Sequence, residues 1–366
     1  MIKEILLAPI TWLYTGVIML RNYLYKTKAL KSTHFNVPVI CVGNLSTGGT
    51  GKTPHTNYLI NLIKPNYKVG VLSRGYKRKT NGYIEVEINS KAENVGDEPL
   101  FYKFKHPNAK VAVCEDRVFG ISAMAQNQEE PMVYLLDDAF QHRAIKADLN
   151  IIITDYNKLY TRDKLLPAGR LREPISGAKR ADIIIVSKCP PLLSKTEKNK
   201  IKLELKPEKY QHIFFSSIAY LPLYSLFNQE LINFEKQKTV LIVSGIANPI
   251  PLEKEIEKNF ETVYIRQFPD HHNYKREDIE SIIRTYENLD EENKIIITTE
   301  KDATRLLAFK NYFEEKNIKV FCLPISVNFD EQEKEAFDKA IKHYLSITLP
   351  LPEEPEDIII NYDYKD

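Results

Sequence analysis

Short apolar runs alternate with longer amphipathic segments along most of the chain. The runs in its first half are continuous, rich in β-branched residues and bounded by residues that favour turns. Such runs are typical of parallel strands buried on both faces of a sheet. The stretch 82–89 alternates apolar and polar positions instead, which predicts a more exposed strand. The strands predicted from the continuous runs lie at 37–44, 67–74, 109–116, 132–139, 149–156 and 181–188.

A second set of apolar runs follows, and an aromatic, strand-like stretch separates it from the first. The chain has 366 residues, a length that fits about two domains. We therefore expect an α/β protein in which a mostly parallel sheet flanked by helices is joined to a second, smaller α/β lobe. The second set of predicted strands lies at 239–246, 261–268, 293–300 and 318–325. The expected segments are an N-terminal helical segment 1–36, a first lobe 37–208, a linking strand segment 209–228, a second lobe 229–348 and a proline-rich acidic tail 349–366.

The N-terminal segment carries an apolar stretch at 5–20 that contains Pro9. This stretch is shorter than the roughly 20 residues that a membrane-spanning helix needs. Basic and aromatic residues at 21–26 follow it, and no small-residue cleavage site of a signal peptide is present. Together with Trp12, these residues suit a helix lying on a membrane surface. A helix packed on the core of the domain is the alternative interpretation.

Composition excludes several classes of protein. The net charge is only +2, so no global basic field attracts nucleic acid. The hydrophobic share of 43% and the charged share of 27% are those of an ordinary soluble protein. The cysteines are far apart and form no C-x-x-C pair, which predicts buried thiols and neither a zinc site nor a disulfide framework. They are Cys41, Cys114, Cys189 and Cys322.

The sequence VICVGNLSTGGTGKTP joins a predicted strand to a predicted helix through a glycine-rich loop. In such a loop, backbone N–H groups converge on phosphate oxygens, a lysine adds positive charge and a hydroxyl reaches Mg²⁺. The loop departs from the common pattern at Ser46, where glycine is usual, and it has Thr47 where some ATPases carry a second lysine. We expect a P-loop nucleoside triphosphate hydrolase fold that binds ATP and Mg²⁺. The predicted nucleotide-binding residues are Thr47, Gly48, Gly49, Thr50, Gly51, Lys52, Thr53 and Pro54.

The predicted strand in MVYLLDDAFQH ends in Asp137 and Asp138. A carboxylate at the end of a strand beside a phosphate loop is where Mg²⁺ or its water is held. We therefore expect both aspartates to bind the metal together with Thr53, and helix capping is the alternative. Gln141 and His142 are expected to face the same opening.

Several stretches together resemble the tetraacyldisaccharide 4'-kinase family of lipid A synthesis. They run in order from Val42 to Leu306, so the resemblance covers most of the chain. Ala139 departs from the family, which usually has glycine there, and this is a small change. The stretches are VGNLSTGGTGKTP, LSRGYKR, VGDEPLF, LLDDAFQH, LLPAGRLREP, FPDHHNY and TTEKDATRL.

The resemblance implies transfer of the γ-phosphate of ATP to the 4'-position of an acylated glucosamine disaccharide 1-phosphate, which yields the lipid A precursor lipid IVA. The resemblance also implies that Asp97 is the base, that His271 assists it, and that Glu173 belongs to the metal and nucleotide site. The family also implies a peripheral or monotopic position on the cytoplasmic face of the bacterial inner membrane. We expect no nucleic acid and no obligate protein as a partner.

Arginines that follow apolar runs or lie in glycine-proline loops are candidates for holding the anionic substrate, because the planar guanidinium suits phosphate. A solvated surface charge is the alternative for each of them. Lys301 and Asp302 resemble a pair that reads a nucleotide base, and a helix start is the alternative. The substrate-binding candidates are Arg74, Arg117, Gln141, His142, Arg170 and Arg172.

Two functions compete on this sequence. The first is the lipid kinase described above. The second is a P-loop ATPase at a membrane surface that is stimulated by a protein partner. The missing second lysine and the apolar N-terminal stretch favour the kinase. A non-enzymatic membrane adaptor would leave the phosphate loop without a purpose.

Overall fold

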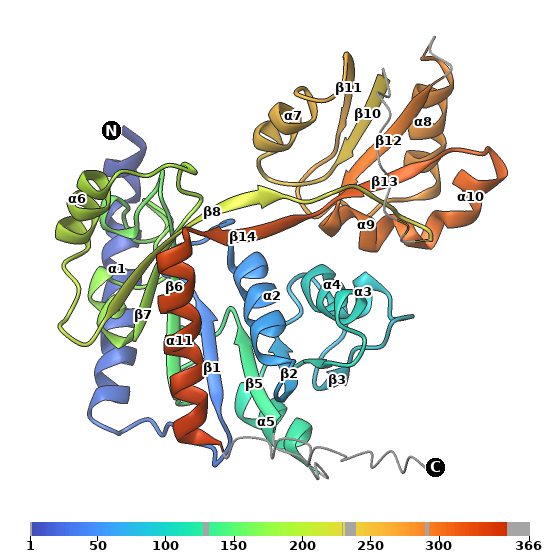
Figure 1. Ribbon diagram of the computed structural model, residues 1–366. Coiled ribbons are helices and arrows are strands. Elements are labelled where there is room, and N and C mark those ends of the chain that lie inside the picture. The colour runs from blue at the N-terminus through green and yellow to red at the C-terminus, as the bar shows by residue number, and fades with distance from the viewer. Residues whose placement is uncertain (1, 127–131, 229, 231–238, 290–292, 350–366) are drawn as a thin grey trace, which may run out of the picture.

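The chain forms two lobes, each built on its own sheet, and a pair of strands joins them (Figure 1). The computed structural model describes residues 2–126, 132–228, 230, 239–289 and 293–349.

The first lobe contains a nine-stranded sheet in the order β14-β8-β7-β6-β1-β5-β2-β4-β3 within the described residues. Neighbouring strands from β8 to β4 are parallel, and only the edge strands β3 and β14 are antiparallel to their neighbours. All residues of β1 are buried, as its continuous apolar run predicts. The strands are β1 (Val39–Gly43), β2 (Lys68–Ser73), β3 (Ile84–Glu85), β4 (Lys110–Val113), β5 (Met132–Asp137), β6 (Leu149–Asp155), β7 (Ile183–Ser187), β8 (His212–Tyr220) and β14 (Ile325–Phe329).

Helices cover both faces of this sheet and form a separate apolar core on each. One core contains side chains of α2, α4 and α11, and the other contains side chains of α5 and α6. The long helix α1 lies along the first lobe (Figure 1), where Tyr14 and Arg21 bond to the backbone of Arg172 and Gln141. The helices of the first lobe are α1 (Ile2–Lys26), α2 (Lys52–Ile63), α3 (Ala92–Val95), α4 (Asp97–Lys105), α5 (Arg117–Ala125), α6 (Lys195–Leu205) and α11 (Glu331–Thr348), with short 3₁₀ helices η1 (Tyr160–Arg162) and η2 (Ile175–Arg180).

The described residues of the second lobe form a five-stranded sheet in the order β11-β10-β12-β13-β9. Helix α8 packs on it through Ile279, Ile282 and Ile283, whose i, i+3, i+4 spacing forms one apolar face. The elements of this lobe are β9 (Tyr224–Ser225), β10 (Thr239–Ser244), α7 (Ile250–Ile256), β11 (Thr262–Gln267), α8 (Arg276–Glu287), β12 (Lys294–Thr299), α9 (Glu300–Leu306), η3 (Leu307–Phe309), α10 (Lys310–Glu315) and β13 (Val320–Leu323).

The lobes are linked by β8 and β14, which pair antiparallel and reach from one lobe toward the other in Figure 1. The chain leaves the first lobe through β8 and returns through β14. Helix α11 then packs on the first sheet and buries Phe337, Ile341 and Leu345. The expected second lobe of 229–348 was therefore wrong at its C-terminal end, because 325–348 completes the core of the first lobe.

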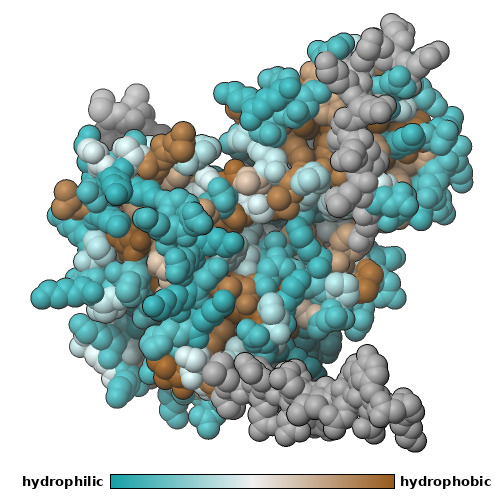
Figure 2. All heavy atoms as spheres, in the orientation of Figure 1, coloured by the Kyte–Doolittle hydropathy of each residue, from teal (hydrophilic) through white to brown (hydrophobic). Residues whose placement is uncertain are grey.

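The predicted α/β architecture with two mostly parallel sheets is confirmed. The stretch 82–89 contributes only the two-residue edge strand β3. The four cysteines are free and buried, as expected. Of the proline-rich tail, 350–366 lies outside the described residues. No helix in the described part of the chain is long and apolar enough to span a membrane. Hydrophilic residues predominate on the face drawn in Figure 2.

Candidate functional site

The phosphate loop connects β1 to α2 at the carboxyl edge of the first sheet. Gly48 has a φ of 101° and Gly51 has a φ of 94°, values in the left-handed region that favours glycine. Gly51 is the N-cap of α2, whose first residue is Lys52. The N-terminus of this helix and the lysine therefore both present positive charge to one place, which is the arrangement that binds phosphate.

A second loop and β7 brace the phosphate loop from the side. The backbone N–H of Thr47 donates to the carbonyl of Arg170 at 2.7 Å. Ser187 Oγ donates to the carbonyl of Thr50 at 2.6 Å. His55, which is 2% exposed, binds the carbonyl of Gly51 through Nδ1 at 2.7 Å. These contacts hold the backbone of the loop in place.

Asp137 lies at the end of β5, next to Val42 of β1 in the sheet register. It is completely buried, and neither of its carboxylate oxygens has a hydrogen-bond partner in the described part of the chain. Burial raises its pKa to about 7, and the negative charges of Glu98 and Asp138 add to the shift. A buried carboxylate without a partner is costly, so this group fits a site that a cation completes.

Asp138 is the next residue and has a φ of 50°. Lys52 Nζ lies 3.6 Å from its Oδ1. Arg172 donates to both carboxylate oxygens, at 2.6 Å to Oδ1 and 3.2 Å to Oδ2. Burial acts to raise the pKa of Asp138, but Lys52 and Arg172 lower it to about 2. Asp138 is therefore ionised, and it links Lys52 of the phosphate loop to the loop that carries Arg170 and Arg172.

Glu98 was missed as a site residue by sequence reasoning, although it follows Asp97 in the same G-D-E-P stretch. Its Oε1 accepts a hydrogen bond of 2.8 Å from Thr53 Oγ1 and another of 2.9 Å from Lys301 Nζ. Burial acts to raise its pKa, but Lys301 and Lys52 lower it to about 2. The P-loop hydroxyl and an ionised carboxylate thus lie together.

Oxygen ligands of this kind suit Mg²⁺, which uses one or two carboxylates and substrate phosphates in preference to an all-protein cage. The described residues contain no group of three or more His, Cys, Asp or Glu that could hold a metal by itself. The residues that fit a magnesium site are Thr53, Glu98, Asp137 and Asp138.

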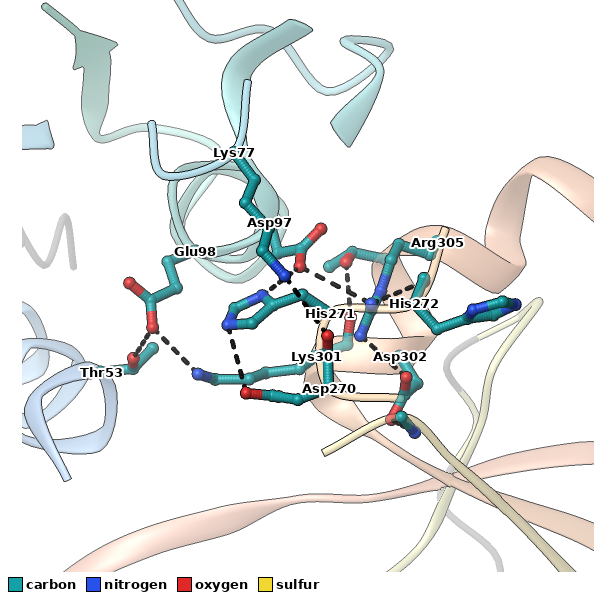
Figure 3. Close-up of polar contacts among 12 residues, drawn as sticks. Thr53, Lys77, Asp97, Glu98, Asp270, His271, His272, Lys301, Asp302 and Arg305 are labelled. Carbon is teal, nitrogen blue, oxygen red and sulfur yellow. Dashed lines mark hydrogen bonds and ion pairs between the residues drawn. The ribbon is translucent and has the colours of Figure 1, made fainter. Parts of the chain in front are cut away.

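Asp97 and His271 meet across the lobe interface, as the resemblance to the kinase family implies. Nδ1 of His271 donates to Oδ2 of Asp97 at 2.8 Å (Figure 3). Asp97 is the first residue of α4, and His271 lies between β11 and α8 with a φ of 59°. Arg305 Nη1 lies 3.7 Å from the same Asp97 oxygen. The carboxylate is therefore positioned from both lobes.

Asp302 supports this cluster from inside the second lobe and is completely buried. It accepts hydrogen bonds from the backbone of Gly245 at 3.0 Å, from Tyr274 Oη at 3.0 Å and from Arg305 Nη2 at 2.8 Å. Its carboxylate is fully engaged, so it does not present a free edge to a nucleotide base. The helix start was the better interpretation, because Asp302 lies in the first turn of α9.

The four candidate arginines point in different directions. Arg172 contacts Asp138, whereas Arg170 pairs with Asp163 at 2.9 Å. Arg117 is 2% exposed, and its Nε and Nη2 have no hydrogen-bond partner. Burial lowers the pKa of Arg117 to about 10, partly offset by Asp137 and Asp138. Arg74 is exposed.

Gln141 and Glu173 form a polar link beneath the phosphate loop. Gln141 Nε2 donates to the carbonyl of Asn44 and to Oε1 of Glu173, both at 2.8 Å. Arg180 pairs with Glu173 at 2.8 Å. The metal role of Glu173 stays a prediction, and its carboxylate is occupied by these two donors. His142 lies nearby, and burial together with Arg117 lowers its pKa to about 4.

Helix α1 packs against this side of the site. Tyr14 Oη donates to the carbonyl of Arg172 at 2.7 Å, and Arg21 Nη2 donates to the carbonyl of Gln141 at 3.0 Å. A cavity of about 430 Å³ separates Trp12 from Ile175 and their neighbours. Much of the remaining surface of α1 is apolar and exposed. Its large exposed residues are Ile10, Trp12, Leu13, Val17, Met19, Leu20 and Tyr23.

Comparison with known proteins identifies one family. The profile of a family described as tetraacyldisaccharide-1-P 4'-kinase matches residues 3–345. A protein named tetraacyldisaccharide 4'-kinase from Parabacteroides distasonis is 46% identical over 347 residues, which cover 92% of this chain and 94% of that protein. Another protein of that name, from Flavobacterium johnsoniae, is 41% identical and covers 94% of this chain and 98% of its own.

A solved structure agrees with these relatives. The crystal structure of LpxK from Aquifex aeolicus in complex with ATP superposes with a TM-score of 0.72 at 30% sequence identity. The match covers 93% of this chain and 99% of the other. The likeness therefore extends over both lobes.

Proposed function

The chain belongs to the tetraacyldisaccharide-1-P 4'-kinase family, and from this membership we propose how its own residues carry out the reaction. It is a kinase of lipid A biosynthesis that transfers the γ-phosphate of ATP to the 4'-position of the tetraacyldisaccharide 1-phosphate precursor. The contact between Asp97 and His271 is the observation that carries the proposed mechanism.

The nucleotide is held by the phosphate loop and the N-terminus of α2. Lys52 supplies charge to the terminal phosphates, and backbone N–H groups of 47–53 bind their oxygens. A magnesium ion, when bound, neutralises phosphate charge. The residues that would hold it are Thr53, Glu98, Asp137 and Asp138. Asp137 fits this role because its two buried carboxylate oxygens have no hydrogen-bond partner among the described residues.

Asp97 is the proposed base for the 4'-hydroxyl of the acceptor. An ionised carboxylate only accepts hydrogen bonds. Oδ1 of Asp97, the oxygen that His271 does not contact, can therefore take the hydroxyl proton late in phosphoryl transfer. His271 fixes the other oxygen through Nδ1 and so orients the carboxylate toward the acceptor. Arg305 Nη1 lies 3.7 Å from the same oxygen and places a positive charge beside the carboxylate.

We propose that different arginines bind different phosphate groups of the two substrates. Arg172 is already oriented by Asp138 toward the phosphate loop. Nε and Nη2 of Arg117 are buried and have no hydrogen-bond partner among the described residues, and their N–H groups suit a phosphate oxygen of the substrate. Arg74 is exposed and can approach the 1-phosphate of the acceptor. Arg170 contributes structurally through Asp163.

The lipid acceptor reaches the site from a membrane surface, with α1 as the contact. Trp12 is 74% exposed and Leu13 is 71% exposed on the outer face of this helix. Burial of each such side chain contributes about 1.5–3 kcal/mol, so a few of them suffice for peripheral binding. We propose that the protein works on the cytoplasmic face of the inner membrane, where ATP is present.

The test is the dependence of ADP release on the acceptor. With the acylated disaccharide 1-phosphate in mild detergent, ADP release should rise in step with loss of the acceptor. The deacylated sugar phosphate serves as the matched control for the acyl chains. Release of ADP that ignores the acceptor and responds to an added protein would support the alternative ATPase.

A further inference from the structure

The segment TTEKDATRL at 298–306 has a feature that the kinase mechanism above does not use. Lys301 is the second residue of α9 in the second lobe, and its side chain crosses to the first lobe. Its Nζ donates to Oε1 of Glu98 at 2.9 Å, and the same oxygen accepts the hydroxyl of Thr53 at 2.8 Å (Figure 3).

This shared oxygen keeps the ammonium of Lys301 within two hydrogen bonds of the Thr53 hydroxyl. In a phosphate loop, that hydroxyl would help to hold the metal that accompanies the terminal phosphates of the nucleotide. Its link to Thr53 therefore puts the ammonium of Lys301 on the side of the loop where those phosphates would bind. Asp97 is the residue before Glu98, so the proposed base and the ammonium belong to one cluster of side chains (Figure 3).

We propose that Lys301 is a catalytic residue supplied by the second lobe, whose ammonium contacts the phosphoryl group in transit, while Glu98 holds the amine ready. This inference rests on the proposed kinase function. The 4'-oxygen forms a bond to the γ-phosphorus as the bond to the bridging oxygen of ADP breaks, and the hydroxyl proton goes to Asp97. Lys301 keeps its proton and contributes only positive charge to the equatorial oxygens.

A simple tie between the lobes is the competing explanation, and the structure contains one for comparison. Lys105 of α4 forms an ion pair with Glu300 of α9, the residue before Lys301. Glu300 also accepts the backbone N–H of Ile325 at 3.1 Å. This pair crosses the same interface in the opposite direction, and in the described residues neither member bonds to the phosphate loop. Lys105 is therefore a matched control for a purely structural role.

The experiment compares Lys301→Met with Lys105→Met in the full-length protein. Removal of a charge that acts on the transferring group costs about 10³–10⁵ in kcat in related phosphoryl-transfer enzymes. We expect Lys301→Met to lower kcat by at least about 10²-fold with KM for ATP changed less than about threefold, because ground-state binding is kept. Lys105→Met should lower kcat by less than about tenfold. Lys301→Arg should recover part of the loss.

A binding measurement provides a readout independent of lipid transfer. ADP with aluminium fluoride and Mg²⁺ mimics the transferring phosphoryl group, and its affinity is compared with that of ADP alone. We expect Lys301→Met to lose the extra affinity for the fluoride complex and to keep that for ADP, whereas Lys105→Met keeps both.

Equal losses of kcat in the two methionine variants, or full retention of the fluoride complex by Lys301→Met, would overturn the inference. If Lys301→Met does not fold, Lys301→Gln takes its place in both measurements. Wild-type protein that never phosphorylates the disaccharide would contradict the proposed function instead, and the fluoride measurement would still decide the role of the lysine.

Discussion

Nδ1 of His271 lies 2.8 Å from Oδ2 of Asp97, although the two residues are 174 positions apart in the chain. Asp97 begins α4 of the first lobe, and His271 belongs to the second. A base whose partner comes from another lobe is complete only when the lobes are in contact. Turnover should therefore depend on the interface as well as on the phosphate loop.

Loss of either member of this pair should slow chemistry more than binding. We expect Asp97→Asn and His271→Ala each to lower kcat by about 10²–10⁴, the usual contribution of general base catalysis. The affinity for ATP should stay within about threefold, because neither side chain bonds to the phosphate loop. Initial rates of disaccharide phosphorylation and ATP titrations measure the two effects.

His272 is the matched control for His271. Its Nε2 binds Asp278 at 2.9 Å and its ring stacks on Phe268, so its side chain stays within the second lobe. We expect His272→Gln to change kcat by less than about tenfold. Equal effects of the two histidine substitutions would contradict a specific role for His271.

Arg170 and Arg172 lie in the same loop and offer a matched pair of substitutions by lysine. Arg172 binds both oxygens of Asp138, and a lysine cannot reproduce this two-pronged contact. We expect Arg172→Lys to lower kcat/KM about 10–100-fold, which is about 1.4–2.7 kcal/mol. Arg170→Lys should lose less than about fivefold, because Arg170 pairs with Asp163 and not with the site. Steady-state kinetics with varied ATP measures both. Equal losses would show that Arg172 acts only structurally.

Asp137 makes stability depend on pH and on metal. Folding raises its pKa from 3.8 to about 7, so the folded protein holds this proton more tightly than the unfolded chain does. The contribution to stability is therefore full below about pH 4 and is lost as the pH rises through about 7. Asp137→Asn has no carboxylate at this position and therefore does not lose stability in this way. We compare the free energy of unfolding of the variant with that of the wild type at two pH values. The difference, variant minus wild type, should be about 1–3 kcal/mol larger at about pH 8 than at about pH 4.

The same variant tests the metal site. Mg²⁺ should raise the melting temperature of the wild type at about pH 8, because a ligand that binds only the folded state stabilises it. Asp137→Asn should lose most of this effect. Chemical denaturation at several pH values and thermal melts with and without Mg²⁺ provide the measurements. A variant that responds to Mg²⁺ like the wild type would exclude Asp137 from the metal site.

The exposed face of α1 should determine membrane binding. Leu13 is 71% exposed on this face, whereas Leu203 is 76% exposed on α6 and serves as the control. We expect Leu13→Glu to weaken binding to anionic vesicles about tenfold or more, because it removes the apolar burial of one leucine. Leu203→Glu should bind normally in the same sedimentation assay. Identical binding by both variants would contradict the role of α1.

Much of the fold could be predicted from the sequence because strands buried on both faces leave continuous apolar runs. The boundary of the second lobe could not. Helix α11 carries Phe337, Ile341 and Leu345 on one face, a pattern that predicts an amphipathic helix but does not say which sheet it covers. The antiparallel pairing of β14 with β8 decides this, and pairing over long distances leaves no local signal.

The same distinction holds for the site. The phosphate loop and Asp137 are evident because their residues are consecutive and lie at strand ends. The hydrogen bond from Lys301 to Glu98 connects residues that are 203 positions apart in the chain, so it depends on how the lobes pack. Asp302 looked available for a ligand in the sequence, yet its carboxylate accepts hydrogen bonds from four donors of its own lobe. Residue type and spacing do not reveal which polar groups are already satisfied.

The most direct test of the account is the transfer of label from γ-labelled ATP to the acylated disaccharide 1-phosphate by purified protein in mild detergent with Mg²⁺. The account predicts a lipid labelled at its 4'-position with the wild type and none with Lys52→Ala. Label that appears only in inorganic phosphate, from protein that is folded and binds ATP, would contradict it.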